Sequence, residues 1–139
     1  MQPTSLYEKY RPACWEQVLG QDKVVSQIQR LRERSGSLGG RGYFISGQSG
    51  TGKTSICRLI ALDIADYPMG IIEVDAQQLD LPMLNSWYKS SWTYAMSAGK
   101  TGRAYIVNEA HQLRDVIIAR LLTILENLPP HTLYCFTTT

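Results

Sequence analysis

The chain has 139 residues, enough for one domain with its own hydrophobic core. Its hydrophobic content of 44%, charged content of 19% and formal net charge of +2 are ordinary for a soluble globular protein. A net charge so near zero gives no global electrostatic reason to expect nucleic-acid binding. No run is long and apolar enough to cross a membrane, and the N-terminus lacks the apolar segment of a signal peptide. We therefore expect no membrane partner and a cytoplasmic location.

The three cysteines, Cys14, Cys57 and Cys135, lie far apart and form no C-x-x-C pair. This spacing argues against a zinc site built from them. Cys57 and Cys135 lie within apolar patterns, which predicts that they are core residues. The absence of a disulfide framework fits a reducing compartment.

The N-terminal part, residues 1–41, begins with a segment in which Pro12 bars an early helix. Apolar residues at helical spacing then predict a helix over 22–34, and a Ser/Gly-rich loop ends it. Lys and Arg outnumber Asp and Glu in this part of the chain. A solvated helix face explains that excess best, and contact with phosphate or DNA is the alternative.

In residues 42–139, short apolar runs alternate with longer segments of helical spacing. We expect strands over 43–45, 71–74, 104–107 and 133–138, and helices over 54–64, 81–96 and 113–127. This alternation predicts an α/β fold with a mainly parallel sheet flanked by helices. The aromatic cluster of the helix 81–96 is interpreted as packing against the sheet or a neighbour rather than as a recognition surface; it comprises Trp87, Tyr88, Trp92 and Tyr94.

The most informative motif, at 47–54, matches G-x-x-x-x-G-K-[ST] without a mismatch. An expected strand precedes it and an expected helix follows, which disfavours a chance match. Its glycines allow backbone N–H groups to surround phosphate oxygens, and the helix N-terminus favours the anion. Lys53 is expected to reach the β- and γ-phosphates of ATP, and the Thr54 hydroxyl to ligate Mg²⁺. The predicted nucleotide-binding residues are Gly47, Gln48, Ser49, Gly50, Thr51, Gly52, Lys53, Thr54 and Ser55.

A second motif is the strand end that carries Asn108 and Glu109. In P-loop ATPases an acidic residue at such a position helps to hold Mg²⁺, and a following Glu activates the attacking water. Asn108 stands where Asp is expected and brings an oxygen but no charge, so Mg²⁺ affinity should be lower. Glu109 keeps the position of a general base. The alternative, a strand end that is polar by chance, is weakened by the phosphate loop upstream.

The last strand ends in Thr137, Thr138 and Thr139. A hydroxyl there is expected to lie between the two motifs, beside the γ-phosphate. Without the other motifs, a β-branched strand terminus would explain these residues equally well.

Four blocks together resemble one family. They are the entry L-Y-E-K-Y-R-P at 6–12 with the V-L-G-Q at 18–21, the phosphate loop, the I-E-V-D-A at 72–76, and the stretch 104–139, which contains L-L-x-x-L-E before Pro129-Pro130. The chain resembles the ATPase domain of AAA+ clamp loaders, and among them the gamma/tau subunits of bacterial DNA polymerase III. The resemblance covers nearly the whole chain.

The resemblance implies that residues 42–139 form a P-loop NTPase core of the AAA+ type. This core ends with the strand that carries the γ-phosphate sensor, called sensor 1. Residues 1–41 would supply a segment of the adenine pocket and a helix. The resemblance also implies an adenine pocket lined by Tyr10, Arg11, Pro12, Val18 and Leu19. It makes Glu109 the catalytic base, and Thr138 or Thr139 the sensor of the γ-phosphate. The implied partners are ATP or ADP, other clamp-loader subunits and a sliding clamp, with DNA as a further candidate.

The chain also departs from this family. Asn108 replaces Asp, and the family's four-cysteine zinc module is missing between Ile64 and Ile71. The arginine finger, the fifth strand and the helical lid would lie beyond Thr139, so we expect a truncated portion of such a subunit. Loss of the fifth strand would leave the phosphate-loop strand at an exposed sheet edge.

Two functions follow from these observations. In the first, the chain is the ATP-binding core of a clamp-loader-type ATPase, and this chain by itself is slow or inactive in hydrolysis. In the second, it is a nucleotide-gated module that does not hydrolyse ATP, which Asn108 favours. A small P-loop kinase is disfavoured because no Arg-rich lid segment is present.

Overall fold

The computed structural model describes residues 22–48 and 52–139. In chain order, its elements are α2 (Asp22–Ser35), β1 (Gly42–Ser46), α3 (Lys53–Leu62), β2 (Ile71–Asp75), the 3₁₀ helix η2 (Ala76–Gln78), α4 (Leu81–Ser90), β3 (Arg103–Asn108), the 3₁₀ helix η3 (Ala110–Gln112), α5 (Asp115–Leu125) and β4 (Thr132–Thr138). None of the described helices is long and apolar enough to span a membrane.

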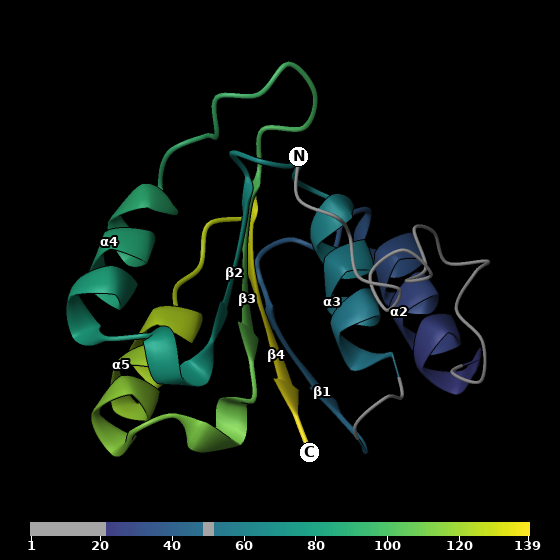
Figure 1. Ribbon diagram of the computed structural model, residues 1–139. Coiled ribbons are helices and arrows are strands. Elements are labelled where there is room, and N and C mark those ends of the chain that lie inside the picture. Colours follow the sequence, from purple (N-terminus) through teal and green to yellow (C-terminus); the bar gives the residue numbers. More distant parts are fainter. Residues whose placement is uncertain (1–21, 49–51) are drawn as a thin grey trace, which may run out of the picture.

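The four described strands form one sheet in the order β1-β4-β3-β2, and each pair of neighbours is parallel. Helices α2 and α3 cover one face of this sheet, and α4 and α5 cover the other (Figure 1). The expected α/β fold with a parallel sheet between helices is therefore confirmed. Because all four strands run the same way, their carboxyl ends meet at a single edge of the sheet.

Two hydrophobic cores follow from the alternation of side chains along each strand. On β3, Ala104 and Ile106 point towards α3, and Tyr105 and Val107 point towards α4 and α5. β4 alternates in the same way. Cys57 and Cys135 are fully buried in the core beside α3, as the sequence predicts.

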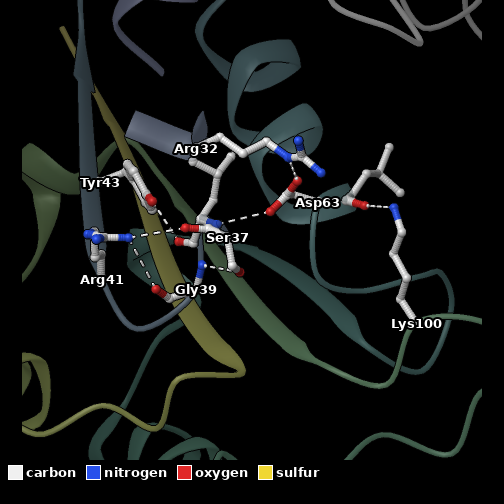
Figure 2. A network of polar contacts seen from close by, with 9 residues as sticks. Arg32, Ser37, Gly39, Arg41, Tyr43, Asp63 and Lys100 are labelled. Atoms are coloured by element: carbon white, nitrogen blue, oxygen red, sulfur yellow. Dashed lines mark hydrogen bonds and ion pairs between the residues drawn. The ribbon is translucent and has the colours of Figure 1, made fainter. Parts of the chain in front are cut away.

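A polar network around Asp63 connects α2, α3 and the start of β1 (Figure 2). Asp63 follows the last residue of α3, and its carboxylate accepts hydrogen bonds from the Arg32 side chain and from the backbone N–H of Leu38, the latter at 2.9 Å. The Tyr43 hydroxyl donates to the Leu38 carbonyl oxygen at 2.6 Å. These contacts fix the loop after α2 and thereby the path of β1, the strand that leads into the phosphate loop.

The helix expected over 81–96 is shorter than predicted, because α4 ends at Ser90. Two hydroxyls bind carbonyl oxygens at this end: Ser91 donates to Tyr88 at 2.6 Å and Thr93 donates to Ser90 at 2.8 Å. Such side-chain hydrogen bonds compete with helical ones, and this ends the helix. The aromatic cluster is consequently divided. Trp87 is buried against the sheet as expected, whereas Trp92 and Tyr94, which follow the helix, are exposed.

Candidate nucleotide-binding site

The predicted motifs meet at the edge where β1, β3 and β4 end. The phosphate loop follows β1, Asn108 ends β3, and Thr138 ends β4. β4 lies between the other two strands in the sheet. Ligands of open parallel α/β sheets bind outside the carboxyl ends of the strands, so this is the edge at which a nucleotide is expected.

Helix α3 begins at Lys53, directly after the phosphate loop. The residue that precedes the helix, Gly52, has φ of 83°, a left-handed conformation that glycine adopts without strain. The first turn of α3 contains no acidic residue, so no side chain of that turn opposes the positive end of the helix dipole. Both features suit an anion. Ser49, Gly50 and Thr51 lie outside the described residues.

Lys53 connects the phosphate loop to the end of β4. Its Nζ donates to the carbonyl oxygen of Gly47 at 2.6 Å and to that of Thr138 at 3.1 Å. The side chain is only 8% exposed. Because an ammonium group has three donors, the two hydrogen bonds to described residues leave one N–H that a phosphate oxygen can accept.

Thr54 and Asn108 are in direct contact across the site. The Thr54 hydroxyl donates to Oδ1 of Asn108 at 3.2 Å, and the Thr137 hydroxyl donates to the same oxygen at 3.0 Å. Thr137 is almost fully buried. The Asn108 oxygen therefore joins the first turn of α3 to the ends of β3 and β4.

The other end of the Asn108 side chain contacts β2. Its Nδ2 donates to Oε2 of Glu73 at 3.2 Å. Glu73 in turn accepts two hydrogen bonds from Arg58 of α3, at 2.8 and 2.9 Å. This two-bond ion pair balances a partly buried carboxylate beside the site.

Glu109 directly follows β3 and has φ of 58°, which is rare for a residue other than glycine. Its backbone N–H donates to the Thr137 hydroxyl at 3.3 Å. Its carboxylate lies 3.4 Å from Nε2 of His111, whose Nδ1 lies 3.3 Å from the Thr138 hydroxyl. Strained backbone of this kind is common at functional sites, and here it accompanies the turn of the chain away from the sheet.

The residues predicted for Mg²⁺ fit that ion in chemistry. The Thr54 hydroxyl and the Asn108 amide offer neutral oxygens, and Mg²⁺ is usually held by few protein ligands together with water and phosphate oxygens. Within the residues that the structure describes, no group of three or more His, Cys, Asp or Glu side chains forms a metal site of its own.

The remaining predicted site residues are placed as follows. Ser55, in the first turn of α3, is buried, and Gln48 and Thr139 are exposed. The five residues of the expected adenine pocket lie outside the described residues; they are Tyr10, Arg11, Pro12, Val18 and Leu19. The structure brings together Lys53, Thr54, Asn108, Glu109 and Thr138.

Sequence reasoning gave no role to three residues that the structure places at or beside the site: Arg58, Glu73 and His111. Two of them carried a signal. Glu73 is a charged residue inside an expected strand, and Arg58 is a charged residue one helical turn after Thr54, among the apolar residues that follow Ser55. The signal lay in two charges of opposite sign within segments that are mostly apolar.

Comparison with known proteins gives relatives for nearly the whole chain. It is 29% identical over 159 residues to the DNA polymerase III subunit gamma/tau of Mycoplasma genitalium, which covers 96% of this chain and 25% of the relative. It is 28% identical to the DNA polymerase III subunit tau of Bacillus subtilis, over 97% of this chain and 27% of the relative. The chain thus spans about a quarter of the length of these curated relatives. No family model matches the chain.

The first of these alignments is longer than the chain itself, so the relative carries additional residues inside the matched region. Among solved structures, a variant of Thermotoga maritima RuvB matches with a TM-score of 0.66 at 18% identity, over 93% of this chain and 42% of that one. RuvB is an AAA+ P-loop NTPase, and the match concerns the fold. The chain therefore has the fold of an AAA+ P-loop NTPase domain and resembles, over nearly its whole length, the gamma/tau subunits of bacterial DNA polymerase III.

Proposed function

We propose that this chain is the ATP-binding core of a clamp-loader-type AAA+ ATPase that acts in DNA replication. The observation that carries the proposal is the contact of Thr54 with Asn108 beside Lys53. It joins a complete phosphate-loop motif to the end of β3 at the edge of the sheet where nucleotides bind. The relatives, named as DNA polymerase III subunits, support the assignment to replication.

The proposed roles follow from position and chemistry. Lys53 and the backbone of residues 47–55 bind the phosphates, and Thr54 with Asn108 holds Mg²⁺, which compensates phosphate charge. Glu109 accepts a proton from the attacking water, and the Thr138 or Thr139 hydroxyl contacts the γ-phosphate. Residues 1–41 supply the adenine pocket and a helix, and residues 42–139 form the core. In the intact assembly ATP is hydrolysed to ADP, and the partners are other clamp-loader subunits and a sliding clamp, with DNA as a candidate.

A non-hydrolysing, nucleotide-gated interaction module is the second candidate, and Asn108 favours it. An amide at this position holds Thr54 but supplies no negative charge towards the metal. We therefore expect this chain by itself to hydrolyse ATP more slowly than ~1 s⁻¹, the low end of ordinary turnover numbers. Steady-state turnover at or above that rate would exclude the second candidate for this chain.

Calorimetric titration with ATP and with ADP, each with and without Mg²⁺, tests the binding proposal. Lys53→Ala should abolish binding because it removes the ammonium group at the phosphates. Lys89→Ala is the matched control, since Lys89 is exposed in the last turn of α4, away from the site. Equal affinity in the two variants would contradict the proposed site.

A further inference from the structure

The Asn108 side chain has two chemically different ends, and only one of them suits the site. The amide oxygen faces the hydroxyls of Thr54 and Thr137, and the amide nitrogen faces Glu73. Resting on the function proposed above, we propose that Glu73, held by Arg58, is a positioning residue. It orients the Asn108 amide so that the oxygen faces Thr54 and the position of the metal.

The strand register places Glu73 beside Asn108. Glu73 of β2 is opposite Ile106 of β3, and Asn108 lies two residues further along the same strand. Since residues two apart share a face of the sheet, both side chains point to the face covered by α3. Arg58 extends from α3 onto this face and meets the Glu73 carboxylate with two N–H donors.

The preference for one orientation follows from donors and acceptors. An ionised carboxylate only accepts hydrogen bonds, so it attracts the amide NH₂ and repels the amide oxygen. The two threonine hydroxyls can rotate to donate or to accept, and they therefore set no orientation of their own. Among the described residues, Glu73 is thus the neighbour that distinguishes the two ends of the Asn108 amide.

The fork of Arg58 gives Glu73 a fixed direction. Two hydrogen bonds to one guanidinium hold the carboxylate in the plane of that group. Side-chain exposures of 28% for Arg58 and 23% for Glu73 leave the pair only partly solvated. A carboxylate held in this way keeps one oxygen, Oε2, aimed at Nδ2 of Asn108.

Only an amide at position 108 needs a neighbour that fixes which of its two ends faces Thr54. With Asp there, both carboxylate oxygens are equivalent, and either one accepts the hydrogen bond from Thr54. The positioning role of Glu73 should therefore disappear when Asn108 is replaced by Asp. A merely structural role of the ion pair would persist in both backgrounds.

The test removes the ion pair as a unit, because a single substitution would leave an uncompensated charge. The paired variant Arg58→Met, Glu73→Leu is made with Asn108 and with Asn108→Asp, and each of the four proteins is titrated with ATP in the presence and absence of Mg²⁺. In the Asn108 background, loss of the pair should lower the Mg²⁺-dependent gain in affinity by about fivefold, the factor that corresponds to one ordinary hydrogen bond. In the Asn108→Asp background the same loss should not lower that gain, because removal of Glu73 there relieves repulsion between two carboxylates.

A second measurement is independent of nucleotide. In the unmodified chain, the Asn108 side-chain NH₂ should give two resolved proton resonances with slow solvent exchange, because one N–H is bound to Glu73. In the paired variant, this protection should be lost while the backbone amide resonances of β3 keep their dispersion, which shows that the fold persists.

Three outcomes would overturn the inference: an equal loss of Mg²⁺-dependent affinity in both backgrounds, no loss in the Asn108 background, or unchanged exchange of the Asn108 amide. If the unmodified chain binds no ATP, the proposed function fails. The amide exchange then decides alone whether Glu73 orients Asn108.

Discussion

The hydroxyl of Thr54 and the amide oxygen of Asn108 lie 3.2 Å apart, although 54 positions separate the two residues in the chain. The contact joins the helix that begins at the phosphate loop to the strand that ends beside it. Asn108 thus serves as an acceptor for Thr54, as an Asp would, but without a negative charge.

Replacement of Thr54 tests the contact directly. Thr54→Val keeps the shape of the side chain and removes the hydroxyl, so the Mg²⁺-dependent gain in ATP affinity should fall by about fivefold or more. Thr54→Ser restores the hydroxyl and should keep most of the gain. The measurement is calorimetric titration with and without Mg²⁺. If Thr54→Ser were as impaired as Thr54→Val, the hydroxyl would not be the group that matters.

Asn108→Asp should strengthen Mg²⁺-dependent nucleotide binding. A negative charge beside the ion adds attraction, and a modest effect of about tenfold is expected because solvent and the nearby Glu73 carboxylate oppose it. Asn127→Asp adds the same charge at an exposed position after α5 and serves as the control. Unchanged Mg²⁺ dependence in Asn108→Asp would show that residue 108 is not near the metal.

Two stacked tyrosines in the core differ in the partner of their hydroxyls. The Tyr105 hydroxyl donates to the Trp87 carbonyl oxygen at 3.2 Å, whereas that of Tyr134 is buried without a hydrogen bond to any described residue. Tyr134→Phe should therefore leave the free energy of unfolding unchanged or raise it by about 1 kcal/mol, and Tyr105→Phe should lower it by about 1 kcal/mol. Urea denaturation of both variants measures the difference. A marked loss of stability in Tyr134→Phe would show that its hydroxyl has a partner in solution.

The same core predicts that stability falls in alkaline solution. Burial raises the pKa of Tyr134 and of Tyr105, and burial followed by contact with Cys57 raises the pKa of Cys135. In the unfolded chain these groups lose their protons near about pH 8.5 for cysteine and about pH 10 for tyrosine. Above those values the native state holds more protons than the unfolded state, so the free energy of unfolding decreases as pH rises.

Urea denaturation at several pH values from neutral to about pH 10.5 checks this slope, with tyrosine ionisation expected in the upper part of the range. Tyr134→Phe should flatten the slope above about pH 10, where the unfolded tyrosine ionises. Lys89→Ala, an exposed change in α4, should leave the slope as it is. A stability independent of pH over this range would contradict the burial of these groups.

The pattern of residues predicted most of the described elements because each has a local cause. Helix α2 begins at Asp22 and ends one residue beyond the expected 22–34, and β4 contains the whole expected strand with one additional residue. The largest error, at the end of α4, also has a local cause that periodicity does not see. The hydroxyls of Ser91 and Thr93 donate hydrogen bonds to backbone carbonyl oxygens there. The spacing of the aromatic residues nevertheless continues as it would in a helix.

The sequence by itself determined that a phosphate loop lies between a strand and a helix, and that Asn108 ends a later strand. Both are properties of short, contiguous segments, in which residue type and spacing set the backbone conformation. Only the tertiary structure decided that β4 lies between β1 and β3, which places Thr137 against Asn108. It also decided that Arg58 and Glu73 meet beside that amide. Strand order and side-chain partners depend on how separate segments pack, and no local pattern encodes which of several parallel arrangements gives the best burial and hydrogen bonding.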